Sequence, residues 1–384
     1  MKKNKLWLFA ALFVAVVLVF TACGSDDEQP AGNETPDLTF DRPTPDTVEP
    51  DEDVELFEDT DVNVFLISHS PTSILDDGSF NQGAWDGIQQ FVAANPGTVY
   101  DFLQPHEASD AARIDMIADA VEHGANVLIL PGFDFISSVT EAQYIFPDVK
   151  FVLLDASPET FAPNTIAIHY AEEQAGFLAG YAAVTEGYRN LGFMGGRAVP
   201  AVVRFGHGFI QGAEHAAESL GLDAGEVEVR FHYLDDFAPD PAHTTAAAAW
   251  FASGTEVIFV AAGGAGASVM QAAGTAGASV IGVDTDQSHL SDSVVTSAVK
   301  GLDVSVFDML TAVRNGNWDG GQELRFDASN NGVNLVMGAN SQLQNFTQAQ
   351  LDAVFNEIAT NNINVNASLD MADITTTLVT VIEQ

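Results

Sequence analysis

Short apolar runs alternate with longer segments in which apolar residues recur every three or four positions, from about residue 62 to residue 313. Short uninterrupted apolar runs are typical of strands buried on both faces, and the wider spacing is typical of helices. The predicted strands are Val62–Ile67, Val99–Phe102, Val127–Leu130, Phe151–Leu154, Ile166–Ile168, Leu191–Phe193, Val227–Tyr233, Val257–Val260, Ser279–Val283 and Val294–Ala298. The predicted helices are Ala84–Ala94, Ala108–Glu122, Ile136–Phe146, Glu172–Thr185, Ala201–Leu220, Thr244–Ser253, Ala267–Ala273, Val304–Val313 and Gln348–Ile358.

This alternation predicts an α/β fold with parallel sheets, because parallel neighbours are joined by helical crossovers. The units form two successive series of similar length, the first ending near Asp155–His169 and the second near Asp284. We therefore expect two doubly wound lobes. Residues 61–168 with about 300–324 would form the first lobe and 169–299 the second, with a tail, 325–384, packing on the second near the hinge.

The start of the chain is typical of a secretory leader over residues 1–22. A basic segment, Met1–Lys5, precedes an apolar run from Leu6 to Phe20, which is short for a membrane-spanning helix of about 20 residues. The segment before the chain's only cysteine, Cys23, resembles a lipoprotein cleavage box, with Phe20 in place of the usual Leu. We expect Cys23 to become the lipidated first residue; an uncleaved anchor helix is the alternative. Either would place the body outside the cytoplasm.

Residues 23–60 consist largely of Asp, Glu, Pro, Thr and Asn, with few apolar side chains. Such a segment cannot bury enough surface to fold, so it is predicted to be a disordered acidic tether. The whole chain has a formal net charge of −41, which argues against nucleic acid as a partner and is typical of adaptation to a saline medium. A single cysteine excludes an intramolecular disulfide and a cysteine-based zinc site.

The loop after the first predicted strand carries the first candidate ligand contacts. Residues 74–83 are small and polar apart from Ile74, Leu75 and Phe80, and they lead into a helix. Ligands of open α/β sheets bind outside the carboxyl ends of strands, at loops of this kind. Phe80 offers a flat apolar face and Asn81 offers donors and acceptors. A βα loop with a core phenylalanine is the simpler interpretation.

Charged residues end three later strands. Asp155 and Asp284 each follow an apolar run, where a carboxylate could accept hydrogen bonds from a polar ligand. Capping of a following helix is the alternative for both. Lys300 ends another strand, and beyond the leader the only other lysine is Lys150, which we expect in a surface turn. We expect Lys300 to face the ligand rather than to be an ordinary exposed lysine.

Glycines after the strand Val257–Val260, among them Gly264, could let a ligand approach the backbone. No Lys-Ser/Thr follows them, so the phosphate-binding loop of nucleotide hydrolases is excluded. The glycines of Gly206–Gly212 fall one residue short of the dinucleotide-binding pattern, and we interpret them as helix packing. The sequence contains no HExxH or GxSxG motif and no cluster of metal ligands, and His69, His106, His169 and His207 are scattered. We expect no catalytic residues, no metal and no cofactor.

Six segments follow one another in the chain: Asp77–Trp85, Ala125–Phe133, Pro147–Asp155, Glu173–Tyr181, Gly192–Gly196 and Ile281–Gln287. In this order they resemble the basic membrane protein family, the PnrA-like purine nucleoside-binding lipoproteins of ABC importers, and the first is similar to the family signature. The resemblance implies a type I periplasmic-binding-protein fold with a ligand cleft at the hinge between the lobes.

The same resemblance implies roles for the candidate residues. Phe237, after the strand Val227–Tyr233, is similar to the family's second aromatic, so Phe80 and Phe237 would sandwich a purine. The family's ligand-contacting carboxylates fall at Asp155 and Asp284. The family usually has Asp at the end of the first strand, whereas this chain has Ser68-His69-Ser70, which alters one ligand contact.

The function expected from this resemblance is delivery of a purine nucleoside to an ABC permease by a monomeric, lipid-anchored protein outside the cytoplasm. Three rivals remain open at this point. The same fold could bind another small polar solute or serve as a sensor. A nucleoside-cleaving enzyme would need an acid–base or nucleophile constellation, and a structural surface protein would not need polar and aromatic residues at strand ends.

Overall fold

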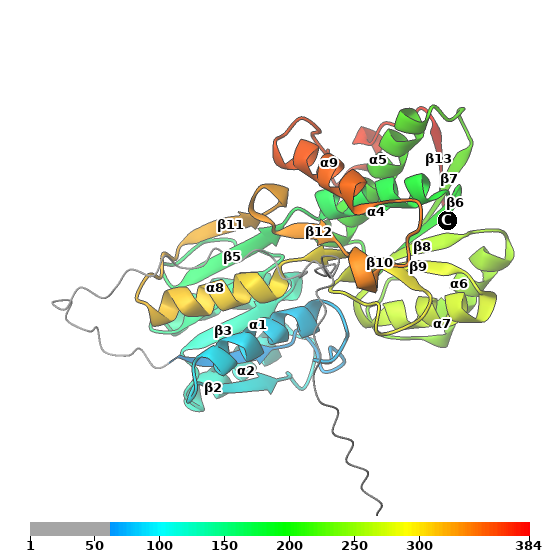
Figure 1. Cartoon of the computed structure of the whole chain (residues 1–384). Helices are drawn as coiled ribbons and strands as arrows, with labels where there is room; N and C mark the ends of the chain where they lie inside the picture. The colour runs from blue at the N-terminus through cyan, green and yellow to red at the C-terminus, as the bar shows by residue number, and fades with distance from the viewer. Residues whose placement is uncertain (1–61) are drawn as a thin grey trace, which may run out of the picture. The chain divides into compact units, whose positions relative to one another are not determined.

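The computed structural model describes residues 62–384 (Figure 1). The predicted leader, Cys23 and the predicted acidic tether lie outside the described residues. Alternating strands and helices form two sheets, and every strand pair but one is parallel. The α/β fold with two parallel-sheet lobes, expected from the hydrophobic pattern, is confirmed.

Sheet one has six strands and sheet two has seven. In spatial order, sheet one contains β11 (Gln322–Phe326), β5 (Thr165–Tyr170), β4 (Lys150–Leu154), β3 (Val127–Pro131), β1 (Asn63–Ile67) and β2 (Val99–Leu103). Sheet two contains β12 (Val333–Leu335), β10 (Val294–Lys300), β9 (Ser279–Asp284), β8 (Val257–Ala261), β6 (Asn190–Gly195), β7 (Val227–Tyr233) and β13 (Val379–Glu383). The exceptional antiparallel pair is β10 with β12.

The two sheets repeat one winding. The first five strands of each run in the order second, first, third, fourth, fifth, so the order reverses between β1 and β3 in sheet one and between β6 and β8 in sheet two. Helices after strands on either side of such a reversal lie on opposite faces of the sheet, which leaves a crevice at the carboxyl ends of the strands. The fold therefore places one crevice in each lobe.

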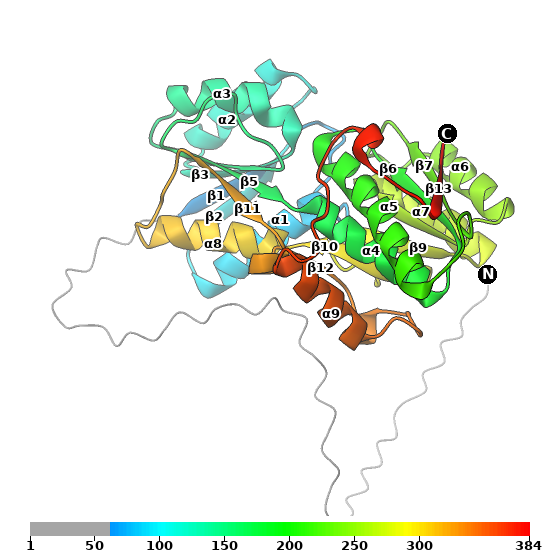
Figure 2. The ribbon, with the colours of Figure 1, turned by 90° about the horizontal axis from the view of Figure 1, so that it is seen from above.

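Helices cover both faces of each sheet (Figures 1 and 2). On sheet one, α1 (Phe80–Ala94) and α8 (Leu302–Arg314) lie on one face, and α2 (Asp110–Glu122) and α3 (Ile136–Ile145) on the other. On sheet two, α4 (Glu172–Glu186) and α5 (Pro200–Leu220) lie on one face, and α6 (Pro241–Ala252) and α7 (Gly266–Ala276) on the other. The helix α9 (Gln348–Ala359) packs beside α4.

The chain crosses between the lobes three times. It passes from β5 in sheet one to α4, from β10 in sheet two to α8, and from β11 in sheet one to β12 in sheet two. The segment after β11 stays with the second lobe, where β12 and β13 join sheet two. These crossings place the carboxyl ends of β4 and β10 near one another, which matters for the site described below.

Glycines let α4 and α5 pack with their backbones in contact. A Cβ atom at Gly208 or Gly212 would overlap the carbonyl of Glu173 or Phe177, and one at Gly180 would overlap the carbonyl of Phe209. The interpretation of the Gly206–Gly212 segment as helix packing is therefore confirmed.

The start of α1 differs most from the hydrophobic spacing and bears on the candidate residues. Helix α1 starts at Phe80, not Ala84, so Phe80 belongs to the first helical turn rather than to a loop. The Asp77 carboxylate accepts hydrogen bonds from the backbone N–H groups of Ser79, Asn81 and Gln82 at 2.8, 3.1 and 3.1 Å. A side chain three residues before the helix thus satisfies N–H groups that lack a partner within the helix. Burial raises the pKa of Asp77 to about 6 against these bonds.

Candidate functional site

A cavity of about 510 Å³ lies where the carboxyl ends of strands from both sheets meet. Its wall includes all seven candidate ligand residues: Phe80, Asn81, Asp155, Phe237, Gly264, Asp284 and Lys300. They lie at or after the carboxyl ends of six strands, β1, β4, β7, β8, β9 and β10, and come from both lobes. The structure thus brings the candidates together; their contact with a ligand stays a prediction.

Lys300 is the charged centre of this cavity. Its side chain is only 2% exposed, and Nζ lies 2.5 Å from Asp155 Oδ2, 3.3 Å from Glu172 Oε1 and 3.7 Å from Asp284 Oδ1. The ammonium group also lies 5.0 Å from the ring centre of Phe80 and 5.1 Å from that of Phe205. A buried charge is tolerated when it is paired and hydrogen-bonded. Three carboxylates and aromatic faces provide that pairing here.

The pKa values around Lys300 follow from this crowding. Burial alone would lower the pKa of Lys300, but Asp155, Glu172 and Asp284 outweigh it and hold the pKa above its ordinary value. Burial raises the pKa of Asp155 to about 8 against the charge of Lys300. Burial also works to raise the pKa of Glu172, yet Lys300 and Arg204 hold it below its ordinary value. Burial therefore outweighs the nearby cation at Asp155, whereas the two cations outweigh burial at Glu172.

Asp155 and Asp284 are held in the left-handed backbone region, with φ of 58° and 66°. Aspartate tolerates this region better than most residues. Asp155 directly follows β4 and Asp284 is the last residue of β9, and in both cases the next element is another strand, so no helix follows directly and the interpretation as helix caps is wrong. Asp284 Oδ2 accepts a 2.6 Å hydrogen bond from the Ser79 hydroxyl of the other lobe, whereas the buried Oδ1 of Asp155 has no hydrogen-bond partner.

The candidate aromatics approach the cavity from opposite lobes. Phe80 is the first residue of α1 in lobe one, and Phe237 follows β7 in lobe two. Phe237 lies over the backbone at Gly196 and Gly263, where a Cβ at Gly196 would overlap its ring. Both rings are partly buried against the main apolar core. Each ring therefore packs against the core and also lines the cavity, so a role in core packing does not exclude a role in stacking on a ligand.

Asn81 and Gly264 can make fewer ligand contacts than their sequence positions indicate. Both hydrogens of the Asn81 amide are directed to the loop before it, at 3.0 Å to Ser73 Oγ and 2.9 Å to the Ile74 carbonyl. Asn81 therefore braces the loop, and only its Oδ1 could serve a ligand. A Cβ at Gly264 would lie 3.3 Å from the Phe237 carbonyl, so glycine keeps this wall close to the aromatic segment.

Sequence reasoning missed a second group of charged residues in the same cavity. Arg113 of α2, Asp134 after β3 and Arg197 after β6 line it together with His69, which stands at the end of β1. Asp134 Oδ2 lies 3.2 Å from Arg197 Nη1, an ion pair between the two lobes, and Arg113 Nη2 lies 3.9 Å from Asp134 Oδ1. The only sequence signal was Ser68-His69-Ser70 in place of the family's usual Asp at the end of the first strand.

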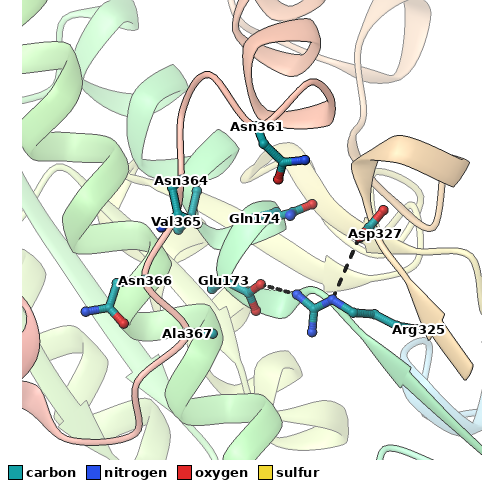
Figure 3. A pocket seen from close by; sticks show the side chains of 9 residues that line it. All are labelled: Glu173, Gln174, Arg325, Asp327, Asn361, Asn364, Val365, Asn366 and Ala367. Carbon is teal, nitrogen blue, oxygen red and sulfur yellow. Dashed lines mark hydrogen bonds and ion pairs between the residues drawn. The ribbon is translucent and has the colours of Figure 1, made fainter. Parts of the chain in front are cut away.

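A second, polar cavity of about 530 Å³ lies where the chain crosses between the lobes (Figure 3). Arg325 of β11 donates from Nη2 to Glu173 Oε1 at 2.5 Å, joining sheet one to the start of α4, and its Nε lies 3.8 Å from Asp327 Oδ2. Amide side chains of the tail, such as Asn361 and Asn364, complete its wall. None of the seven candidate residues lies here, and we interpret the Glu173–Arg325 pair as a brace at the hinge.

Within residues 62–384, no group of three or more His, Cys, Asp or Glu side chains is arranged to hold a metal ion. Over the same residues, no helix combines the length and the apolarity that crossing a membrane requires.

The sequence model of one family, described as ABC transporter substrate-binding protein PnrA-like (Bmp), matches residues 65–368. The chain belongs to this family. The match spans both lobes and the cavity between them. Bmp proteins are substrate-binding proteins of ABC transporters rather than enzymes, so a small-molecule ligand and a permease partner follow at that level.

Relatives and solved structures agree with this assignment. The ABC transporter nucleoside-binding protein BmpA of Lactococcus lactis subsp. cremoris (strain MG1363) is 29% identical over 302 residues, covering 73% of this chain and 82% of that protein. Basic membrane protein A1 of Borrelia garinii subsp. bavariensis is 26% identical over 269 residues, covering 68% of this chain and 76% of that protein.

Among solved structures, a solute-binding protein of an ABC transporter system from Aeropyrum pernix K1 superposes with a TM-score of 0.71 at 19% identity, covering 81% of this chain and 95% of that one. A second, from Conexibacter woesei DSM 14684, gives a TM-score of 0.63 at 21% identity, covering 80% and 99%. These likenesses show the fold alone. The Bmp chain described here has the type I periplasmic-binding-protein fold that its motifs imply.

Proposed function

We propose that this protein binds a purine nucleoside in the cavity between its lobes and delivers it, outside the cytoplasm and from a lipid anchor at Cys23, to an ABC permease. The observation that carries the proposal is the composition of one cavity. It combines two phenylalanines from opposite lobes with a lysine and two aspartates at strand ends. A nucleoside has the matching parts, a flat base and a ribose diol.

The ribose is assigned to the end of the cavity around Lys300. Asp284 and Asp155 are acceptors for ribose hydroxyls, and Lys300 is a donor; a diol can donate to one and accept from the other. The unpartnered Oδ1 of Asp155 supports this assignment, because a buried oxygen without a partner costs free energy that a ligand hydroxyl would offset. The base is assigned to the space between Phe80 and Phe237, where each ring would add roughly 0.5–1.5 kcal/mol by stacking.

Binding is coupled to contact between the lobes. The loop before α1 already touches lobe two, because the Gly78 carbonyl accepts 2.9 Å hydrogen bonds from Thr285 Oγ1 and Gln287 Nε2. A ligand held by Phe80 on one lobe and Asp284 on the other would favour this arrangement over one with the lobes apart. Closure is then a shift of population toward the state in which both sets of contacts form.

Calorimetric titration with nucleosides, free bases and ribose tests the proposal. We expect a purine nucleoside to bind, and Phe80→Ala and Phe237→Ala each to weaken it by roughly 2- to 12-fold, the stacking energy converted at 1.4 kcal/mol per decade. Tyr144→Ala is the control, since Tyr144 is 59% exposed on α3 and does not line the cavity. Unchanged affinity in both phenylalanine variants would refute the sandwich.

The rival functions predict other outcomes. If another small polar solute binds and nucleosides do not, the ligand assignment is wrong although the fold is the same. If chromatography of the recovered nucleoside shows free base and ribose, the protein is a nucleoside-cleaving enzyme. We expect the nucleoside to be recovered intact.

The anchor is tested separately. Replacing the only cysteine, Cys23→Ala, is expected to release the protein from the membrane or leave it unprocessed, as fractionation and mass measurement would show. A variant that stays anchored and processed would contradict the lipoprotein assignment.

A further inference from the structure

The charged group missed by sequence reasoning forms the end of the cavity that is not built around Lys300. We call His69, Arg113, Asp134 and Arg197 the arginine cluster. Arg113 is nearly buried and braced, donating from Nε to the His69 carbonyl at 2.9 Å and pairing with the exposed Asp110 at 2.9 Å. Arg197 differs: its side chain is 43% exposed, and its guanidinium carbon lies 4.7 Å from the ring centre of Phe133.

Donors outnumber acceptors in the arginine cluster. Asp134 is its one carboxylate on the cavity wall, and three groups already approach it: Arg197 at 3.2 Å, Arg113 at 3.9 Å and His69 Nε2 at 3.9 Å. Burial lowers the pKa of His69, helped by the two guanidinium groups and opposed by Asp134, so its ring is neutral near pH 7. Arg113 is paired with Asp110 at 2.9 Å, so the donors available to a ligand are those of the more exposed Arg197, whose guanidinium has five N–H donors and no acceptor.

We infer that the arginine cluster, through Arg197, reads the outer edge of the bound base and selects 6-oxopurine nucleosides over 6-aminopurine nucleosides. The inference rests on the proposed function, because it needs a base between Phe80 and Phe237. Gly196 directly precedes Arg197 in the chain, and it packs so closely against Phe237 that a Cβ on Gly196 would overlap the Phe237 ring. A base stacked on Phe237 would thus present an edge toward Arg197.

The chemistry of the two base types differs at that edge. Guanine and hypoxanthine present two acceptors side by side, O6 and N7, which match the parallel N–H groups of an arginine. Adenine presents N7 beside an amino group at position 6, so one donor of the arginine would face another donor. An edge that meets the N–H donors of Arg197 therefore favours the 6-oxo form.

The test compares the dissociation constants of inosine, guanosine and adenosine, measured by calorimetry on the full-length protein. We expect inosine and guanosine to bind about 5- to 150-fold more tightly than adenosine, the discrimination of a good bidentate arginine–base pair. In Arg197→Gln the ratio of adenosine to inosine dissociation constants should fall toward one. Loss of the ion pair between Arg197 and Asp134 should weaken the binding of all three nucleosides equally. The ratio of dissociation constants therefore separates recognition of the base from the contact between the lobes.

Arg230→Gln is the matched control. Arg230 lies on β7 of the same lobe, its side chain is 22% exposed, it pairs with Glu228, and it does not line the cavity. The ratio should be unchanged in this variant. Equal wild-type affinity for adenosine and inosine, or a ratio that Arg197→Gln leaves intact, would overturn the inference while the proposed function stands. If no nucleoside binds the wild type, the proposed function fails and the inference fails with it.

Discussion

Replacing Lys300 by methionine removes the cation from the centre of the cavity while keeping an unbranched apolar stem. Lys300 Nζ is within 3.7 Å of Asp155, Glu172 and Asp284, and the side chain is almost wholly buried. Removing one partner of a buried ion pair costs about 3–5 kcal/mol, because the other charge is left without compensation. Here three carboxylates would lose their shared partner, and of the cations around them only Arg204, 3.3 Å from Glu172, remains.

We therefore expect Lys300→Met to lower the free energy of unfolding by about 3–5 kcal/mol at pH 8. The loss should shrink as the pH falls. Without Lys300, burial raises the folded-state pKa values of Asp155 and Glu172 with less opposition, so the folded variant binds more protons than the unfolded chain. Its stability then increases toward lower pH, and the difference from the wild type narrows between pH 8 and pH 5.

Urea unfolding followed by circular dichroism at pH 8 and pH 5, at constant salt, measures this difference. Lys150→Met is the control, since it makes the same chemical change at the other lysine of the body. Lys150 lies 5.7 Å from the Trp318 ring centre, a contact worth about 0.5–1 kcal/mol. If the two variants lose the same stability at pH 8, or if the loss in Lys300→Met does not depend on pH, the electrostatic account of the cavity is wrong.

Three further outcomes are expected. Burial raises the pKa of Asp155 to about 8, so binding of a ligand hydroxyl that donates to the ionised carboxylate should release a proton. Affinity should then rise by up to ~10-fold per pH unit from pH 6 to 8. Calorimetry in two buffers of different ionisation enthalpy counts the protons released, and a count of zero would exclude this contact. Asp284→Asn should weaken nucleoside binding about 10- to 150-fold and free-base binding much less, the range for hydrogen bonds to charged groups; equal losses would contradict the ribose assignment. Gly212→Ala should destabilise the protein by about 1–3 kcal/mol, because its Cβ would overlap the Phe177 carbonyl, whereas Gly274→Ala, with no atom within 4 Å, should not, as thermal unfolding would show.

The hydrophobic pattern was sufficient to predict the fold because each strand and helix of a lobe is determined mainly by its own local sequence. A buried parallel strand must be a short apolar run, and the helix that follows must present one apolar face, so strands and helices can be located from the sequence. The glycines of α5 were interpretable for the same reason, since small residues at helical spacing indicate close packing. The start of α1 at Phe80 was missed because it depends on the Asp77 side chain bonding backbone groups ahead of the apolar stripe.

The position of the candidate residues at strand ends was also available from the sequence, since every strand of a parallel sheet ends on the same edge. Which of them touch was not. Succession along the chain favours contact of Lys300 with Asp284, at the end of the preceding strand, but the structure places Lys300 Nζ closer to Asp155, 145 residues away, at 2.5 Å against 3.7 Å for Asp284. That contact exists because the chain crosses between the lobes beside both β4 and β10. The arginine cluster could not be predicted from the sequence for the same reason. Arg113, Asp134 and Arg197 are far apart in the chain, and Arg197 meets the other two only because the two lobes come together.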